Sequence, residues 1–145
     1  MHNFKENAEV SIGKEKYKSK IIIRNHELIG DEPVESGGQN LGPNPYDFLL
    51  AALGSCTAMT LRMYADRKEW NLTSVNVKLG HEKIHAEDCK DCESKEGKID
   101  TISRVIYLGG ELTGEQRNRL LEIANKCPVH KTLHSEIKVR SSLGE

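Results

Sequence analysis

Alternating apolar and polar residues near the N-terminus predict two paired strands. Residues 8–12 alternate, residues 13–15 suit a turn, and residues 17–29 contain the β-branched run Ile21-Ile22-Ile23. The polar, glycine-rich residues 31–38 are typical of a loop. We therefore expect an N-terminal hairpin that leads into a loop.

A long helix is predicted from Asn44 to about Arg67. Asn44 is a favourable N-cap residue, and Pro45 suits the first helical position. Leu50 and Ala51 lie opposite the main apolar face of this helix and are apolar too, so the first half of the helix should be buried all round. At helical spacing, one face carries Leu49, Ala52, Leu53, Cys56, Met59, Thr60 and Met63.

The second half of the chain predicts another hairpin, a capped helix and a last strand. Residues 75–79 and 102–108 are typical of strands joined by a charged turn, and residues 137–139 suggest the last strand. Thr113 and Gln116 form a capping box for a helix with an apolar stripe. Strands and helices in separate runs indicate the α+β class.

Composition narrows the class of protein further. The 145 residues suit one domain, residues 1–145, and a net charge of −1 without basic blocks excludes a typical nucleic-acid binder. The strongly apolar run 48–53 is far shorter than a membrane span, and the N-terminus does not resemble a signal peptide. We therefore expect a cytoplasmic protein without membrane contact, whose four cysteines are free, metal-bound or catalytic.

Two cysteines stand in unlike settings. Cys56 lies within the long helix, and Pro128 makes Cys127 the N-cap of a short second helix. Free amide hydrogens at such a helix start favour a thiolate. If the two thiols meet in space, they can form a redox pair; otherwise Cys56 is a small core residue and Cys127 a helix cap.

The segment GPNPYDFLLAALGSCTAMTLRMYADRKEW (42–70), followed by IANKCPVHKTL (123–133), resembles the OsmC/Ohr family of osmotically inducible and organic hydroperoxide resistance proteins. The resemblance implies antiparallel sheets packed on a long central cysteine-bearing helix and a second helix, in an intertwined homodimer. It also implies a peroxiredoxin-like peroxidase against oxidative stress. Cys56 would attack an organic hydroperoxide, and Cys127 would resolve the sulfenate as a disulfide. An external dithiol, in relatives often a lipoyl protein, would reduce that disulfide.

Two positions of this chain were compared with the charged residues that accompany the cysteines in the family. The peroxidase branch of the family has a glutamate after the Asn-Pro pair, where this chain has Tyr46. The family's arginine comes from the N-terminal hairpin, and Arg24 is the arginine available there. Resemblance therefore assigns Cys56, Cys127 and Arg24 to catalysis, with no cofactor required.

A second group of candidate ligands lies in the predicted hairpin. His81, His85, Cys89 and Cys92 have the spacing H-x3-H-x3-C-x2-C, and two imidazoles with two thiolates suffice for a structural zinc ion. Two other interpretations stay open, namely a charged hairpin tip with exposed thiols and a Cys89–Cys92 redox pair.

The leading hypothesis is a homodimeric thiol peroxidase that acts on organic hydroperoxides. Two alternatives use the same scaffold. One is a non-catalytic module that binds a small apolar or thiol-reactive ligand, with zinc in the second hairpin. The other is a redox sensor that forms the Cys56–Cys127 disulfide once and changes shape.

Overall fold

The computed structural model describes residues 4–144. Over this range the chain forms two antiparallel sheets and three α-helices, which confirms the predicted α+β class. The chain divides into two compact units, one of residues 1–49 with 138–145 and one of residues 50–137. The single domain expected over residues 1–145 stays a prediction.

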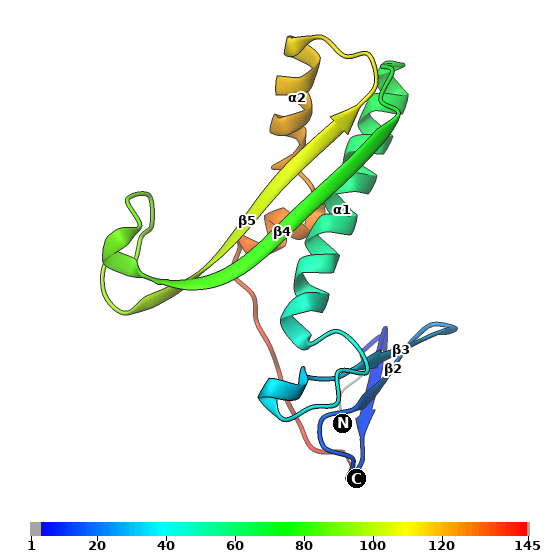
Figure 1. Cartoon of the computed structure of the whole chain (residues 1–145), viewed down its shortest axis with the longest axis vertical. Coiled ribbons are helices and arrows are strands. Elements are labelled where there is room, and N and C mark those ends of the chain that lie inside the picture. The colour runs from blue at the N-terminus through cyan, green and yellow to red at the C-terminus, as the bar shows by residue number, and fades with distance from the viewer. Residues whose placement is uncertain (1–3, 145) are drawn as a thin grey trace. The chain divides into compact units, whose positions relative to one another are not determined.

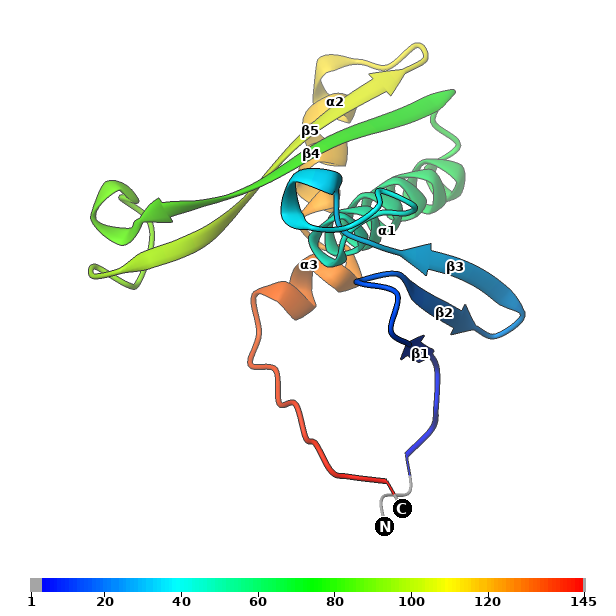
Figure 2. The ribbon, with the colours of Figure 1, turned by 60° about the horizontal axis from the view of Figure 1, so that its bottom comes forward.

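The first unit contains a three-stranded sheet, β1 (Glu9–Ile12), β2 (Ser19–Ile23) and β3 (His26–Gly30), in the order β1-β2-β3 (Figure 2). The prediction of one strand over residues 17–29 was therefore wrong. Ile23 pairs with His26, which leaves Arg24 and Asn25 as a two-residue turn. Arg24 has a left-handed φ of 55°, as tight hairpin turns require.

The loop after β3 is built around the carboxylate of Asp31, which is only 3% exposed. It accepts backbone N–H bonds from Glu32 at 2.8 Å and from Gln39 and Leu41 at 3.2 Å each. At Gly38 a Cβ atom would collide with the carbonyl of Glu32, so this position needs glycine. The loop, which includes the short 3-10 helix η1 (Val34–Ser36), is therefore tightly folded.

Helix α1 (Pro45–Lys68) begins where the sequence predicts. The side chain of Asn44 accepts the N–H of Asp47 at 2.8 Å, and the carboxylate of Asp47 accepts the N–H of Asn44 at 3.0 Å. This reciprocal cap satisfies two amides at the helix start. By length and composition α1 could cross a membrane, as the core helices of many soluble proteins could, so the expected lack of membrane contact stays a prediction.

The second unit contains a long hairpin, β4 (Ser74–His85) and β5 (Lys98–Gly109). It runs alongside α1 and alongside helix α2 (Gly114–Ala124) (Figure 1). The two strands pair along their whole length, from Ser74 with Gly109 to His85 with Lys98. The hairpin was predicted, although its strands are longer than the sequence pattern indicated. The loop between them includes the 3-10 helix η2 (Ala86–Asp88).

Helix α2 (Gly114–Ala124) carries the predicted capping box at Thr113 and Gln116. It packs with α1 in one core, whose buried residues are Leu61, Ala65, Leu72, Leu120, Ile123 and Ala124. Helix α3 (Pro128–Leu133) follows.

Two further sequence predictions were wrong. The first half of α1 is not buried all round, because Leu49 is 37% exposed and Ala51 and Ala52 are exposed as well. Its buried residues instead form a narrow stripe that includes Leu53, Thr57 and Leu61. Residues 137–139 form no strand in the described chain, since a strand needs a partner for its backbone groups and none pairs there.

Candidate functional site

Cys127 is the N-cap of α3, as predicted, and its side chain is fully buried. Its sulfur accepts a hydrogen bond from the N–H of His130 at 3.4 Å. Pro128 occupies the first helical position and has no N–H to satisfy. Local sequence alone therefore explains how this sulfur comes to face the start of α3.

Cys56 reaches the same place from α1. Its half-buried sulfur accepts the N–H of Val129 at 3.5 Å, although Val129 lies 73 positions further along the chain. Consecutive amides of one short helix thus bind the two sulfurs, and neither cysteine is in a disulfide. The structure therefore brings together the two thiols that the resemblance pairs.

Thr57 links the two cysteine-bearing segments. Its buried hydroxyl donates to the carbonyl of Leu53 at 2.7 Å and lies 3.8 Å from the sulfur of Cys127. A hydroxyl has one hydrogen, and the shorter contact with Leu53 takes it. Between Thr57 and Cys127, the donor is therefore the thiol.

Arg104 on β5 completes the network. One guanidinium nitrogen, Nη1, donates to the hydroxyl of Thr57 at 2.9 Å and to the carbonyl of Ala124 at 3.3 Å. The other, Nη2, contacts the side-chain oxygen of Asn125 at 2.9 Å and Nδ1 of His130 at 3.3 Å. A single planar cation thus connects α1, the end of α2 and α3.

The contact with Arg104 also fixes the tautomer of His130. A guanidinium has no acceptor, so Nδ1 of His130 must accept the bond and its proton must lie on Nε2. Burial, with the nearby charges of His134 and Arg104, lowers the pKa of His130. The ring of His134 stacks on it at 4.3 Å. The site therefore holds a neutral imidazole beside a permanent cation.

Sequence reasoning missed both Thr57 and Arg104. The sequence did contain a signal for Arg104. It lies an even number of positions from the apolar residues Ile102, Ile106 and Leu108, so on a strand its side chain points to the same face as theirs. Thr57 is likewise a polar residue four positions from Leu53 and Leu61 on an otherwise apolar stripe. In each case a polar side chain interrupts an inward-facing apolar series.

The predicted arginine, Arg24, belongs to the N-terminal sheet region. It is exposed in the β2–β3 turn of the first unit, so its part in catalysis stays a prediction. Tyr46, in place of the family glutamate, is half exposed in the first turn of α1. Asp47 caps that helix through its bond to the N–H of Asn44.

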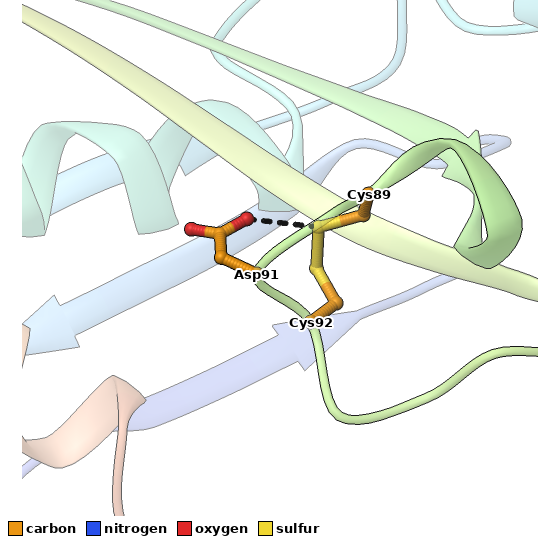
Figure 3. A group of neighbouring side chains, drawn as sticks. All are labelled: Cys89, Asp91 and Cys92. Carbon is orange, nitrogen blue, oxygen red and sulfur yellow. Dashed lines mark hydrogen bonds between the residues drawn. A yellow bond between two sulfur atoms is a disulfide. The ribbon is translucent and has the colours of Figure 1, made fainter.

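The four residues of the predicted zinc site are not gathered around one point. Among the described residues, candidate metal-ligating atoms of Cys89, Asp91 and Cys92 lie within 4.8 Å of one another, and neither His81 nor His85 belongs to that group. Cys89 and Cys92 form a disulfide, and Nε2 of His81 lies 2.8 Å from the carboxylate of Asp100 (Figure 3 shows the disulfide). The zinc site stays a prediction.

Comparisons with known proteins agree with this architecture. The family model described as OsmC-like protein matches residues 37–142. No curated protein matches the chain.

Several solved structures share the fold. A Psychrobacter arcticus 273-4 protein named for osmotic stress induction and a detoxification response has a TM-score of 0.72 at 19% identity, covering 90% of both chains. An organic hydroperoxide resistance protein from Elizabethkingia anophelis scores 0.66 at 17%, covering 94% of this chain and 93% of that one. The organic hydroperoxide resistance protein OsmC of Legionella pneumophila scores 0.65 at 16%, covering 92% and 91%.

Proposed function

Since the chain belongs to the OsmC-like protein family, we propose that it reduces organic hydroperoxides with its thiols, through Cys56 and Cys127. Two structures with the same fold are named for organic hydroperoxide resistance, which supports this substrate class. The single observation that carries the proposal is the meeting of both sulfurs at the first turn of α3.

The two sulfurs differ in the way that such a cycle requires. Cys56 is half-buried, so a peroxide can reach it, whereas Cys127 is fully buried and donates its thiol hydrogen to Thr57. An accessible sulfur suits the attack on peroxide, and a protected thiol nearby suits the resolving step. Cys56 is therefore the peroxidatic cysteine in this proposal.

The proposed cycle has three steps. The thiolate of Cys56 attacks the terminal oxygen of the hydroperoxide, the O–O bond breaks, and the alkoxide takes a proton to leave as an alcohol. The sulfur of Cys127 then attacks the sulfenic acid of Cys56, which forms the disulfide and releases water. An external dithiol reduces this disulfide with two electrons and is itself oxidised. No metal or organic cofactor is needed.

Arg104 is a positioning residue in this cycle. Its guanidinium contacts the hydroxyl of Thr57, next to Cys56, and the ring of His130, whose amide binds Cys127. It thereby holds the two cysteine-bearing segments together.

The test is the consumption of cumene hydroperoxide with dihydrolipoamide as reductant. Wild-type protein should turn over many equivalents, Cys56→Ser none, and Cys127→Ser should accumulate oxidised Cys56 after one turnover. Ser55→Ala, an exposed neighbour on α1, is the matched control and should keep its activity. Unchanged turnover in Cys56→Ser would refute the mechanism. A single stoichiometric oxidation of wild-type protein would favour the redox sensor instead.

We also propose that the active form is a homodimer. In the first unit, apolar side chains that include Val10, Ile21 and Phe48 line a hollow of about 870 Å³. On α1 the side chains of Met59 and Met63 are 66% and 59% exposed. Apolar surfaces of this kind mark interaction sites. Light scattering after gel filtration should give twice the chain mass, and a stable monomer would contradict the proposal.

A further inference from the structure

The loop at the end of the β4–β5 hairpin holds a second sulfur pair, apart from Cys56 and Cys127. Cys89 and Cys92 form a disulfide there, with Cα atoms 5.5 Å apart (Figure 3). Both residues are half-buried, and in both overall views the loop extends away from α1 and α2 (Figures 1 and 2). The peroxide cycle proposed above makes no use of this pair.

A structural role explains this disulfide poorly. The hairpin is already held by strand pairing up to His85 with Lys98, and its loop is closed by the bond from the N–H of Ala86 to the carbonyl of Gly97 at 2.8 Å. The disulfide joins two residues within that loop, with two residues between them, and crosses neither strand. The hairpin can therefore keep its fold when the pair is reduced.

Asp91 gives the two sulfurs different surroundings. One of its carboxylate oxygens, Oδ1, lies 3.3 Å from the sulfur of Cys89 (Figure 3). A disulfide sulfur has no hydrogen, so this contact becomes a hydrogen bond only when Cys89 is a thiol. In the reduced state the carboxylate favours the S–H form of Cys89 and can accept its proton when that thiol reacts. Asp91 is thus placed to act in one redox state of the pair.

From this geometry we propose that Cys89 and Cys92 form a second redox site, which exchanges two electrons with an external dithiol. A thiolate of the dithiol attacks the sulfur of Cys92, the Cys89–Cys92 bond breaks, and Cys89 leaves and takes a proton. This leaves a mixed disulfide between Cys92 and one sulfur of the dithiol. The second thiol of the dithiol then attacks that first dithiol sulfur, which closes the dithiol's own disulfide and releases Cys92. The protein gains two thiols, and the dithiol becomes a disulfide.

In the opposite direction Asp91 has a defined task. When Cys89 attacks a mixed disulfide on Cys92, the carboxylate of Asp91 takes the thiol proton. Asp91 therefore contacts a reacting atom, and its loss should alter the pH dependence of this step more than the stability of the loop.

The experiment uses the full chain with Cys56→Ser and Cys127→Ser, so that Cys89 and Cys92 are the remaining thiols. The native protein is reduced with dithiothreitol, oxidised with glutathione disulfide and reduced again, and free thiols are counted by maleimide labelling and mass spectrometry. We expect complete, reversible interconversion with an unchanged circular dichroism spectrum. Because this background lacks both cysteines of the peroxide cycle, its result is independent of that proposal.

Single substitutions in this background assign the roles. Cys89→Ser should accumulate a glutathione adduct on Cys92, and Asp91→Asn should shift the pH profile of the resolving step. Asp88→Asn, an exposed carboxylate of the same loop, is the matched control and should leave that profile in place.

Three outcomes would overturn the proposal. The first is a disulfide that dithiothreitol reduces only after the protein unfolds, and the second is a thiol pair that stays reduced in excess glutathione disulfide. The third is one tightly bound zinc per chain that blocks oxidation, which would assign Cys89, Asp91 and Cys92 to a metal site instead.

Discussion

The guanidinium of Arg104 donates a hydrogen bond of 2.9 Å to the hydroxyl of Thr57, the residue that follows Cys56 on α1. The same guanidinium contacts Nδ1 of His130, whose backbone amide binds the sulfur of Cys127. The two cysteines are therefore held in place through one arginine on the long hairpin.

Replacing this arginine tests its importance for the geometry of the site. In Arg104→Lys, an ammonium replaces a planar fork that reaches four acceptors, so several contacts should be lost. We expect the free energy of unfolding to fall by about 1–3 kcal/mol. Formation of the Cys56–Cys127 disulfide after peroxide treatment should also slow. Urea denaturation and quenched-flow alkylation measure the two effects.

The control for this change is Arg67→Lys, at the exposed end of α1. A substitution at such a surface position should change the unfolding free energy by less than about 0.5 kcal/mol. Equal losses in the two variants would show that Arg104 has no special place in the fold.

Thr57→Val tests whether the hydroxyl orients the resolving thiol. Valine keeps the shape of threonine but removes the acceptor for Arg104 and Cys127, which should cost about 1–3 kcal/mol of unfolding free energy. Without its acceptor, Cys127 should capture the sulfenic acid of Cys56 less efficiently. Mass spectrometry after repeated peroxide cycles should therefore find more Cys56 as sulfinic acid than in wild type.

Thr57→Ser keeps the hydroxyl and serves as the control. It should show little more sulfinic acid than the wild-type protein, although it loses one buried methyl group. Equal overoxidation in the serine and valine variants would mean that the hydroxyl does not orient Cys127.

The pKa of His130 predicts how stability changes with pH. Burial and the charges of His134 and Arg104 lower the pKa of His130 below its ordinary 6.5 in the folded protein. The unfolded chain therefore binds this proton more readily, so the stabilising contribution is present above pH 6.5 and lost as pH falls through the folded value. We expect the unfolding free energy to decline from pH 7.5 towards 5.5, as measured by urea titrations at each pH.

His130→Asn should make that decline shallower, since asparagine offers an oxygen to Arg104 and does not titrate. His26→Asn, at an exposed position on β3, should leave the slope as in wild type. Parallel slopes for wild type and His130→Asn would contradict this prediction.

A fourth prediction concerns the loop around Asp31. Burial raises the pKa of this carboxyl. Backbone hydrogen bonds from Leu41, Glu32 and Gln39, together with the charge of Lys18, lower it by more, so the pKa of Asp31 lies below its ordinary 3.8. Its stabilising contribution is therefore complete above that pH and lost as pH falls through the folded value. In Asp31→Asn one amide oxygen replaces two carboxylate oxygens. We expect faster hydrogen exchange at the amides of Gln39 and Leu41.

Glu35→Gln lies in the same loop, where its side chain is exposed, and it provides the comparison. Its exchange rates should match those of wild type. Unchanged exchange in Asp31→Asn would mean that the loop is held by its remaining backbone bonds.

Features written in a few neighbouring residues were predictable from the sequence. The start of α1 at Asn44-Pro45, the capping box at Thr113 and the cap at Cys127 all depend on local hydrogen bonds. The turn at Arg24-Asn25 was missed because the isoleucine run continues to its edge and strand pairing decides where the chain reverses.

The centre of the candidate site could not be predicted in this way. Thr57 and Arg104 meet only after β5 packs near α1, so each looks like an isolated polar residue in an apolar series. The strand expected at residues 137–139 is absent because these residues favour a strand by type but pair with no other strand in the described chain. Tertiary partners decided all three cases.

The shared use of α3 by both sulfurs has a practical consequence. The backbone amides of Val129 and His130 each bind a different sulfur. Their nitrogen and proton NMR resonances should therefore report separately on Cys56 and on Cys127. Isotope-labelled protein would thus let the chemistry of each sulfur be followed in real time, without any attached dye.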